Sequence, residues 1–182
     1  MKIIALLLVL TALALPTAVA AETVDNPVYV SWAKFGVGTQ AVYRSVSDAA
    51  GQKTESTVTY KLAEKTPEKA VIEMSTTMTV GGQKIETPVT KMEQVAKIEK
   101  VEPPQTEAKP ADVKSAEEKV KTGGGEFACK VTEVKLDANG MEGVSKTWMS
   151  DEVPGMLVKS STTTVKPVAA ETTIELLSLD KK

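Results

Sequence analysis

Asp151 and Glu152 are the one pair of carboxylates whose spacing suggests acid/base chemistry, and Trp148 lies close before them. Two carboxylates that flank a glycosidic bond can hydrolyse it without a histidine. Adjacent side chains on an extended chain point to opposite sides, however, so this pair is a poor acid/base couple. We therefore do not expect a glycosidase, and we interpret Trp148 as an anchor in the core or at its rim.

The sequence contains no histidine, which excludes Ser-His-Asp and Cys-His catalysis and the usual histidine-ligated zinc sites. Its single cysteine, Cys129, cannot form an internal disulfide. Cys129 alternates in phase with Phe127 and Val131, which predicts a buried, unreactive thiol on one face of a strand. We accordingly predict that the protein is not an enzyme and that it has no cofactor, metal ion or catalytic residues.

Two further matches to catalytic motifs are interpreted as coincidences. Ser31-Trp32-Ala33-Lys34 has the S-x-x-K pattern of penicillin-interacting serine enzymes, and Lys121-Thr122-Gly123 has their K-T-G pattern. In those enzymes the serine begins a buried helix within a large helical domain. Here the first match leads directly into a glycine turn, and no Ser-Asp-Asn element lies between the two matches. The pair does not predict a serine enzyme.

Three segments that resemble ligand loops are better explained as turns. Gly36-Val37-Gly38-Thr39-Gln40-Ala41 opens a strand rather than a helix, so no helix terminus is available for a pyrophosphate. Gly123-Gly124-Gly125 lacks the Lys-Ser/Thr of a phosphate loop. Asp137, Asn139 and Glu142 offer three oxygen donors, fewer than the six to eight that calcium takes.

The first twenty residues have the pattern of a secretory signal peptide. Lys2 precedes the apolar run Ile3–Leu15, and Ala18-Val19-Ala20 predicts cleavage after Ala20. No cysteine stands at the junction, so we expect no lipid anchor. We expect two segments, a signal peptide at 1–20 and a single β domain at 21–182. The mature protein is then exported, periplasmic or secreted, soluble, and without a permanent membrane span.

Charge excludes another set of partners. The chain has 22 basic and 24 acidic residues and a net charge of -2, so neither nucleic acid nor an anionic membrane surface is an expected partner. Arg44 is the only arginine. Because arginine supplies the bidentate fork that grips phosphates and carboxylates, electrostatic recognition of nucleotides is not expected either.

Apolar and polar residues alternate at period two along most of the chain, which predicts strands. We expect an all-β, mainly antiparallel fold of about eight or nine strands, arranged as one strongly curved sheet or half-open barrel. Pro88 predicts an edge position, a bulge or a break within its strand. The expected strands are 39–47, 54–63, 72–80, 83–95, 115–121, 126–137, 141–150, 156–165 and 172–179.

Several local features refine this pattern. Thr66–Lys69, Gly81-Gly82 and Asn139-Gly140 predict turns between strands. Segment 115–121 also fits a helix with a capping box, although we favour a strand. The apolar phase changes after Val131, which predicts a β-bulge near Thr132 or Glu133. Residues 97–114 are rich in proline and charge, which predicts a solvated linker or long loop.

Methionines gather on the predicted strands and leave two interpretations open. These side chains either line an adaptable apolar pocket or simply pack in the core. The residues are Met74, Met78 and Met92, joined by Met141, Met149 and Met156.

The order of several short motifs resembles a group of uncharacterised exported bacterial β-rich proteins. These motifs are Asn26-Pro27, Trp32-Ala33-Lys34-Phe35, Phe127-Ala128-Cys129-Lys130 and the run from Trp148 to Lys159. The tryptophan strand that ends in Val153-Pro154-Gly155 is also similar to the periplasmic lipoprotein-carrier fold, a curved sheet that holds an acyl chain in its concavity. Unlike that fold, this sequence predicts no helix between the signal peptide and the first strand.

Two functions follow as hypotheses. The first is an exported non-enzymatic binding protein that holds a hydrophobic small molecule or lipid in a concave sheet. The second is a structural or protein-interaction component of the cell envelope that uses strand edges or the proline-rich segment to engage an envelope protein.

Overall fold

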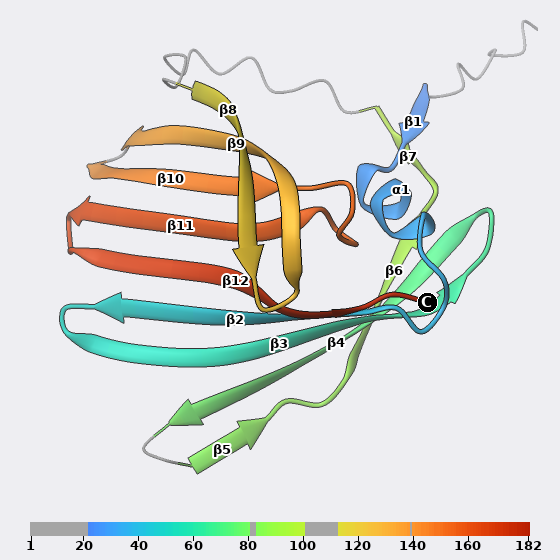
Figure 1. Ribbon diagram of the computed structural model, residues 1–182, viewed down its shortest axis with the longest axis horizontal. Coiled ribbons are helices and arrows are strands. Elements are labelled where there is room, and N and C mark those ends of the chain that lie inside the picture. Colours follow the sequence, from blue (N-terminus) through green and yellow to red (C-terminus); the bar gives the residue numbers. More distant parts are fainter. Residues whose placement is uncertain (1–21, 81–82, 101–112, 139) are drawn as a thin grey trace, which may run out of the picture.

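The computed structural model describes residues 22–80, 83–100, 113–138 and 140–182. Within these ranges the chain forms a ten-stranded antiparallel sheet, a two-stranded sheet and one short helix (Figure 1). The helix is α1 (Pro27–Ala33), and the strands are β1 (Thr23–Asp25), β2 (Gln40–Ala49), β3 (Gln52–Lys65), β4 (Lys69–Val80), β5 (Gln83–Glu86), β6 (Thr90–Val95), β7 (Lys97–Glu99), β8 (Val113–Thr122), β9 (Gly125–Ala138), β10 (Met141–Met149), β11 (Leu157–Lys166) and β12 (Ala170–Asp180).

The large sheet is built from two meanders. Its strand order is β5-β4-β3-β2-β12-β11-β10-β9-β8, and β6 also pairs with β4. Residues 40–95 form one meander and residues 113–180 form the other, and the β2–β12 pairing joins them with Tyr43 opposite Leu176. The all-β antiparallel fold is therefore confirmed. The sheet is strongly curved, since β8 and β9 bend over toward β12 in Figure 1.

The expected strands all exist, with one divided in two. Residues 87–89 interrupt the predicted strand 83–95 and separate β5 from β6, and both pieces lie along β4. Pro88 has no N–H to give to a ladder, so pairing stops around it. Thr87 keeps the interruption next to β4, because its backbone N–H and its hydroxyl both donate to the Thr76 carbonyl oxygen.

The β-bulge expected near Thr132 or Glu133 is wrong. β9 pairs with β8 and with β10 in unbroken register through both residues. Phe127, Cys129 and Val131 are buried, whereas Val134 and Leu136 are half-buried on the opposite face of the same strand. The phase change in the sequence therefore reflects a change in which face is covered, not an inserted residue. Segment 113–122 is a strand, as favoured over the helix.

Helix α1 contradicts the expectation that no helix follows the signal peptide. Asn26 caps it, because the Asn26 side-chain oxygen accepts a hydrogen bond from the Val28 N–H at 3.0 Å and Pro27 occupies the first helical turn. Both are standard start signals for a helix. The Asn26 side-chain amide also donates to the Val95 carbonyl oxygen at 2.8 Å, which fixes the helix next to the end of β6.

Strands also occupy both ends of the segment expected to be a linker. β7 pairs with β1, with Val24 opposite Ile98, and the Lys97 ammonium lies 2.6 Å from the Asp25 carboxylate. β8 begins at Val113. Residues 101–112 lie outside the described residues, as do Gly81, Gly82 and Asn139 from two of the expected turns. The strands that flank those turns pair as hairpins.

Two apolar clusters form the core. One contains Trp32, Leu62, Ala70 and Ile72, and it lies between α1 and the first meander. The other lies between β2 and the curl of the second meander and contains Ala41, Tyr43, Phe127, Cys129, Val153, Val158 and Leu176. Tyr60 packs against both clusters. The space between the clusters is therefore flanked by buried apolar side chains on both sides.

Candidate ligand cavity

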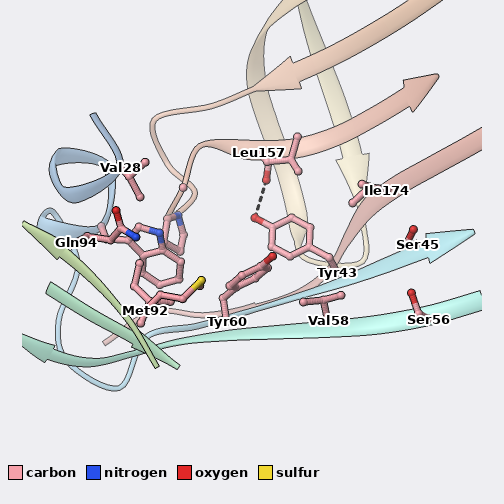
Figure 2. Close-up of a pocket in the computed structure, with 14 residues that line it drawn as sticks. Val28, Tyr43, Ser45, Ser56, Val58, Tyr60, Met92, Gln94, Leu157 and Ile174 are labelled. Atoms are coloured by element: carbon pink, nitrogen blue, oxygen red, sulfur yellow. Dashed lines mark hydrogen bonds between the residues drawn. The ribbon is translucent and has the colours of Figure 1, made fainter. Parts of the chain in front are cut away.

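A cavity of about 470 Å³ lies where the two core clusters meet (Figure 2). Six strands, helix α1 and the loop before β11 contribute to its wall. The lining residues are Val28 and Trp32 of α1, Tyr43 and Ser45 of β2, Ser56, Val58 and Tyr60 of β3, Ile72 of β4, Met92 and Gln94 of β6, Pro154 and Gly155 of the loop, Leu157 of β11 and Ile174 of β12.

The alternation of side chains along β3 determines which of them form the floor of the cavity. Ser56, Val58 and Tyr60 of β3 all line it, so the intervening Thr57 and Thr59 face the other side of the sheet. The register continues this floor across the neighbouring strands, because Tyr43 lies opposite Val58. The floor is therefore set by the period-two pattern that the sequence shows.

The remaining wall depends on two local conformations. The capped helix α1 brings Trp32 against Ile72, and Trp32 is 4% exposed. The loop before β11 reaches the same indole through Gly155, whose φ of 76° lies in the left-handed region that favours glycine. A Cβ atom at Gly155 would stand 3.4 Å from the Trp32 Nε1 atom. A side chain there would press on the cavity wall.

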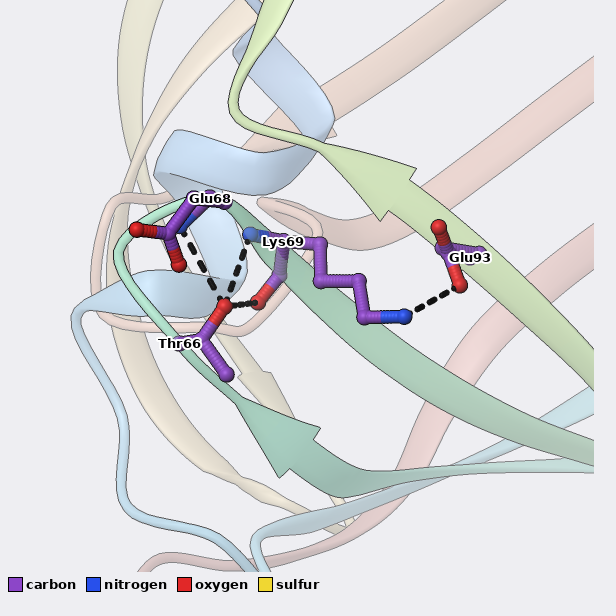
Figure 3. A network of polar contacts seen from close by, with 4 residues as sticks. All are labelled: Thr66, Glu68, Lys69 and Glu93. Carbon is purple, nitrogen blue, oxygen red and sulfur yellow. Dashed lines mark hydrogen bonds and ion pairs between the residues drawn. The ribbon is translucent and has the colours of Figure 1, made fainter.

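An ion pair beside the β3–β4 turn positions β6 (Figure 3). The Thr66 hydroxyl oxygen accepts hydrogen bonds from the N–H groups of Glu68 and Lys69, both at 3.2 Å, which confirms the predicted turn. The Lys69 ammonium lies 2.7 Å from the Glu93 carboxylate, and this hydrogen bond raises the pKa of Lys69. The Glu93 side chain points away from the cavity, where it meets Lys69. Because side chains alternate along a strand, the neighbouring side chains of Met92 and Gln94 face the cavity.

Tyr43 and Tyr60 line the middle of the cavity. Their ring centroids are 5.9 Å apart and the planes meet at 77°, the edge-to-face arrangement that aromatic pairs favour. The Tyr43 hydroxyl donates to the Leu157 carbonyl oxygen at 2.9 Å, as Figure 2 shows. Burial raises the pKa of Tyr43 above its ordinary value, and the nearby Tyr60 raises it further. Tyr43 therefore stays protonated and acts as a hydrogen-bond donor.

Other polar groups of the lining have no protein partner within the part of the chain that the structure describes. These groups are the Trp32 indole N–H, the Tyr60 hydroxyl, the Gln94 amide and the hydroxyls of Ser45 and Ser56. None of the described lining residues is charged. Arg44 stands between Tyr43 and Ser45 on β2 and so faces the opposite side of the sheet, where it lies across from Glu175.

The predicted methionine face contributes one residue to the cavity, Met92. Met74 and Met78 share the face of the floor, since they lie opposite Tyr60 and Ser56, but they are outside the lining. The other methionines considered, Met141, Met149 and Met156, lie in the second meander and in the loop before β11. The sequence pattern did not single out Trp32 or the two tyrosines as cavity residues. The Asn26-Pro27 start signal could have located α1.

The dismissed motifs are not assembled into catalytic groups. The Ser31 hydroxyl donates to the Val28 carbonyl oxygen of its own helix at 2.7 Å, and the Lys34 ammonium lies 3.0 Å from the Asp151 carboxylate. The Trp148 indole N–H donates to Glu118 at 2.9 Å. The burial predicted for Cys129 is confirmed, since its side chain is part of the core cluster, and burial raises the pKa of its thiol.

The described residues contain neither a metal-binding cluster nor a helix of membrane-spanning length. No group of three or more Cys, Asp and Glu side chains within them is arranged to hold a metal ion. No helix among them is long and apolar enough to span a membrane.

No protein-family model matches this sequence, and no curated protein matches it. Solved structures with a similar chain path include the following three. A protein from Parabacteroides distasonis described as a lipoprotein has 13% identity and a TM-score of 0.45, over 80% of this chain and 96% of that one. A protein from Bacteroides fragilis described as exported, with a YmcC-like fold, has 12% identity and a TM-score of 0.46, over 81% of this chain and 97% of that one.

The third structure is MucB in complex with MucA(peri), with 11% identity and a TM-score of 0.47. That match covers 84% of this chain and 54% of the matched chain of the complex. At these identities and TM-scores, none of the three carries an argument about function. The likeness to the lipoprotein-carrier fold stays a prediction.

Proposed function

We propose that the protein is an exported, non-enzymatic binding protein that holds a hydrophobic or amphipathic small molecule in the cavity between α1 and the curved sheet. The observation that carries this proposal is the cavity itself, which is lined mainly by aromatic and aliphatic side chains and a few neutral polar groups. Its volume of about 470 Å³ falls within the range of small-molecule sites, roughly 300–1,000 Å³.

The composition of the wall supports an apolar ligand. Trp32, Tyr43 and Ile72 are almost fully buried at the cavity wall, whereas Val58, Tyr60 and Ile174 keep part of their surface open to the cavity. Covering that remaining apolar surface stabilises a complex by about 25 cal/mol for each Å² removed from water. Met92 adds a flexible, polarisable side chain that adapts to ligand shape.

Export is the second part of the proposal, and it rests on the signal-peptide pattern of residues 1–20. The alternative, an envelope protein that binds partners through a strand edge, has weaker support. β8 forms one edge of the large sheet and carries lysines and glutamates along its exposed length. Charged edge strands, lysine-rich ones above all, discourage pairing with another chain.

The first experiment is native mass spectrometry of the mature protein purified from its export compartment, followed by organic extraction and identification of bound molecules. We expect a stoichiometric apolar ligand. An empty protein that also gains no thermal stability from a panel of lipids would refute the binding function and favour the envelope interaction protein.

A matched pair of variants tests whether the cavity is the site. Val58→Trp fills the cavity from β3, whereas Thr59→Trp adds the same side chain on the opposite face of the same strand. Titration with the uncharged fluorescent probe N-phenylnaphthylamine should show at least about tenfold weaker binding for Val58→Trp and little change for Thr59→Trp. Equal affinity of both variants and the unmodified protein would place binding elsewhere.

A further inference from the structure

The polarity of the cavity wall bears on which class of amphipathic ligand can bind there. The inference drawn from it rests on the proposed function. None of the described lining residues is Asp, Glu, Lys or Arg. Arg44, the only arginine of the chain, lies on β2 between two lining residues and faces the other side of the sheet. An ion that entered the cavity would therefore lose hydration without gaining a counter-ion, which is far costlier than the burial of a neutral group.

The cavity does offer neutral hydrogen-bonding groups, and the best defined is the indole N–H of Trp32. Trp32 is 4% exposed, and its N–H has no acceptor among the described residues. All side-chain nitrogen and oxygen atoms that are fully buried in the described structure have partners, so this N–H borders the cavity space rather than sealed protein. Because an indole can only donate, a ligand that satisfies it brings an acceptor atom.

Polar groups occur toward two ends of the cavity, and the side chains between these ends are mainly aromatic and aliphatic. Gln94 and Val28 lie at the α1 side in Figure 2, whereas Ser45 and Ser56 lie at the far side, with Tyr60 and Val58 in between. Ser45 and Ser56 are direct cross-strand partners. The five residues from Ser56 to Tyr60 on β3 are separated by four steps and span roughly 13 Å at about 3.3 Å per step. An extended chain fits this shape better than a compact ring system.

From these three observations we infer that the cavity selects an uncharged amphiphile, namely an alkyl or acyl chain that carries a neutral hydrogen-bond acceptor such as an ester or amide carbonyl. The Trp32 N–H donates to that acceptor, and Gln94 adds a second neutral partner at the same end of the cavity. The Ser45 and Ser56 hydroxyls face the other end of the chain. Free fatty acids and cationic amphiphiles of the same length are discriminated against.

Three probes with one chain length test the inference. Monodecanoylglycerol is neutral, decanoate is an anion and decyltrimethylammonium is a cation near neutral pH. Calorimetric titration of the mature protein below the micelle concentration of each probe should show the neutral ester binding at least about tenfold more tightly than either ion. Decanoate should bind more tightly as the pH falls and its carboxylate becomes protonated, whereas the ester should not.

A second pair of variants reports on the same preference. Ser56→Lys places an ammonium at the cavity, so decanoate binding should strengthen by about tenfold relative to the ester. Thr59→Lys adds the same charge to the opposite face of β3 and should leave the preference unchanged. Both positions are only half-buried, so both variants should fold, and circular dichroism checks that they do.

The outcomes separate this inference from the proposed function. If either ion binds as tightly as the ester, the selection for an uncharged amphiphile is wrong while the binding function stands. If Ser56→Lys and Thr59→Lys change the preference equally, the ligand does not lie along β3 and the inference is wrong. If none of the three probes binds while N-phenylnaphthylamine does, the inference is wrong and the binding function stands; if N-phenylnaphthylamine does not bind either, the proposed function itself fails.

Discussion

The Tyr43 hydroxyl on β2 donates a hydrogen bond to the Leu157 carbonyl oxygen on β11, at 2.9 Å and across 114 positions of sequence. β12 separates the two strands in the sheet, so this hydrogen bond crosses the concave side instead of following the ladder. It fixes the curvature at the point where the Tyr43 ring meets the cavity. One phenol group therefore links the curvature of the sheet to the wall of the cavity.

Tyr43→Phe should lower the free energy of unfolding by about 1–2 kcal/mol, because it removes the donor and leaves the Leu157 carbonyl without its partner. Urea denaturation measures this change. Tyr60→Phe is the matched control, because the Tyr60 hydroxyl also lines the cavity but has no protein partner in the described structure. Its effect should stay within about 0.5 kcal/mol. Equal destabilisation by both variants would contradict the role of the hydrogen bond.

Gly124→Ala should destabilise the protein by about 1–3 kcal/mol through overpacking. The β8–β9 turn packs so closely on β12 that a Cβ atom at Gly124 would stand 2.7 Å from the Leu176 Cδ2 atom. In a Leu176→Ala background this clash is absent, so the same glycine substitution should cost much less. Urea denaturation of the four proteins gives the coupling energy. A cost that is the same in both backgrounds would show that the contact with Leu176 is unimportant.

The carboxylate of Glu118 should make stability depend on pH. Hydrogen bonds from the Trp148 indole N–H and from Lys146 lower the pKa of Glu118 below its usual 4.5. A lowered pKa in the folded state means that the contribution is present above the unfolded pKa and is lost as the pH falls through the folded one. The stability difference between the unmodified protein and Glu118→Gln should therefore be present at neutral pH and shrink as the pH falls below the usual pKa of 4.5.

Denaturant unfolding at several pH values checks this dependence. Glu117→Gln is the control, because the side chain of that exposed neighbour makes no hydrogen bond or ion pair in the described part of the chain. It should show no comparable change with pH. A Glu118→Gln difference that stays constant from neutral pH to acid would contradict the assignment.

Cys129 should react slowly with a thiol reagent in the native protein and rapidly in urea. Its side chain is 3% exposed and burial raises the pKa of the thiol, so both access and the thiolate fraction are low. Lys130→Cys adds a thiol at the next, exposed position of β9 as an internal standard. That variant should label in a fast and a slow phase. Fast labelling of Cys129 in the native protein would overturn its burial.

The strand content could be predicted because period-two alternation is a local property. The runs that became β3 and β4 carry their apolar residues on one face, and the turn at Thr66–Lys69 has a composition that is typical of turns. The sequence pattern did not predict helix α1, although Asn26 and Pro27 are start signals for a helix. Seven residues offer too short a stretch for helical periodicity to outweigh the strand pattern around them.

Other features could not be predicted from local sequence. The β1–β7 pair joins residues such as Asp25 and Lys97 that are 72 positions apart, and each partner is three residues long. The expected bulge in β9 failed for a related reason. Alternation tells which residues share a face, but not which face the rest of the chain covers.

The sequence by itself determined the class of fold and excluded catalysis that depends on histidine, because alternation and the absence of histidine are properties of the chain alone. The tertiary structure decided where a ligand has room to bind. The cavity exists because α1, the β2–β4 floor and the loop before β11 converge on Trp32 and Tyr60 from separate parts of the chain. Such a convergence depends on long-range packing, and no local pattern of residues encodes it.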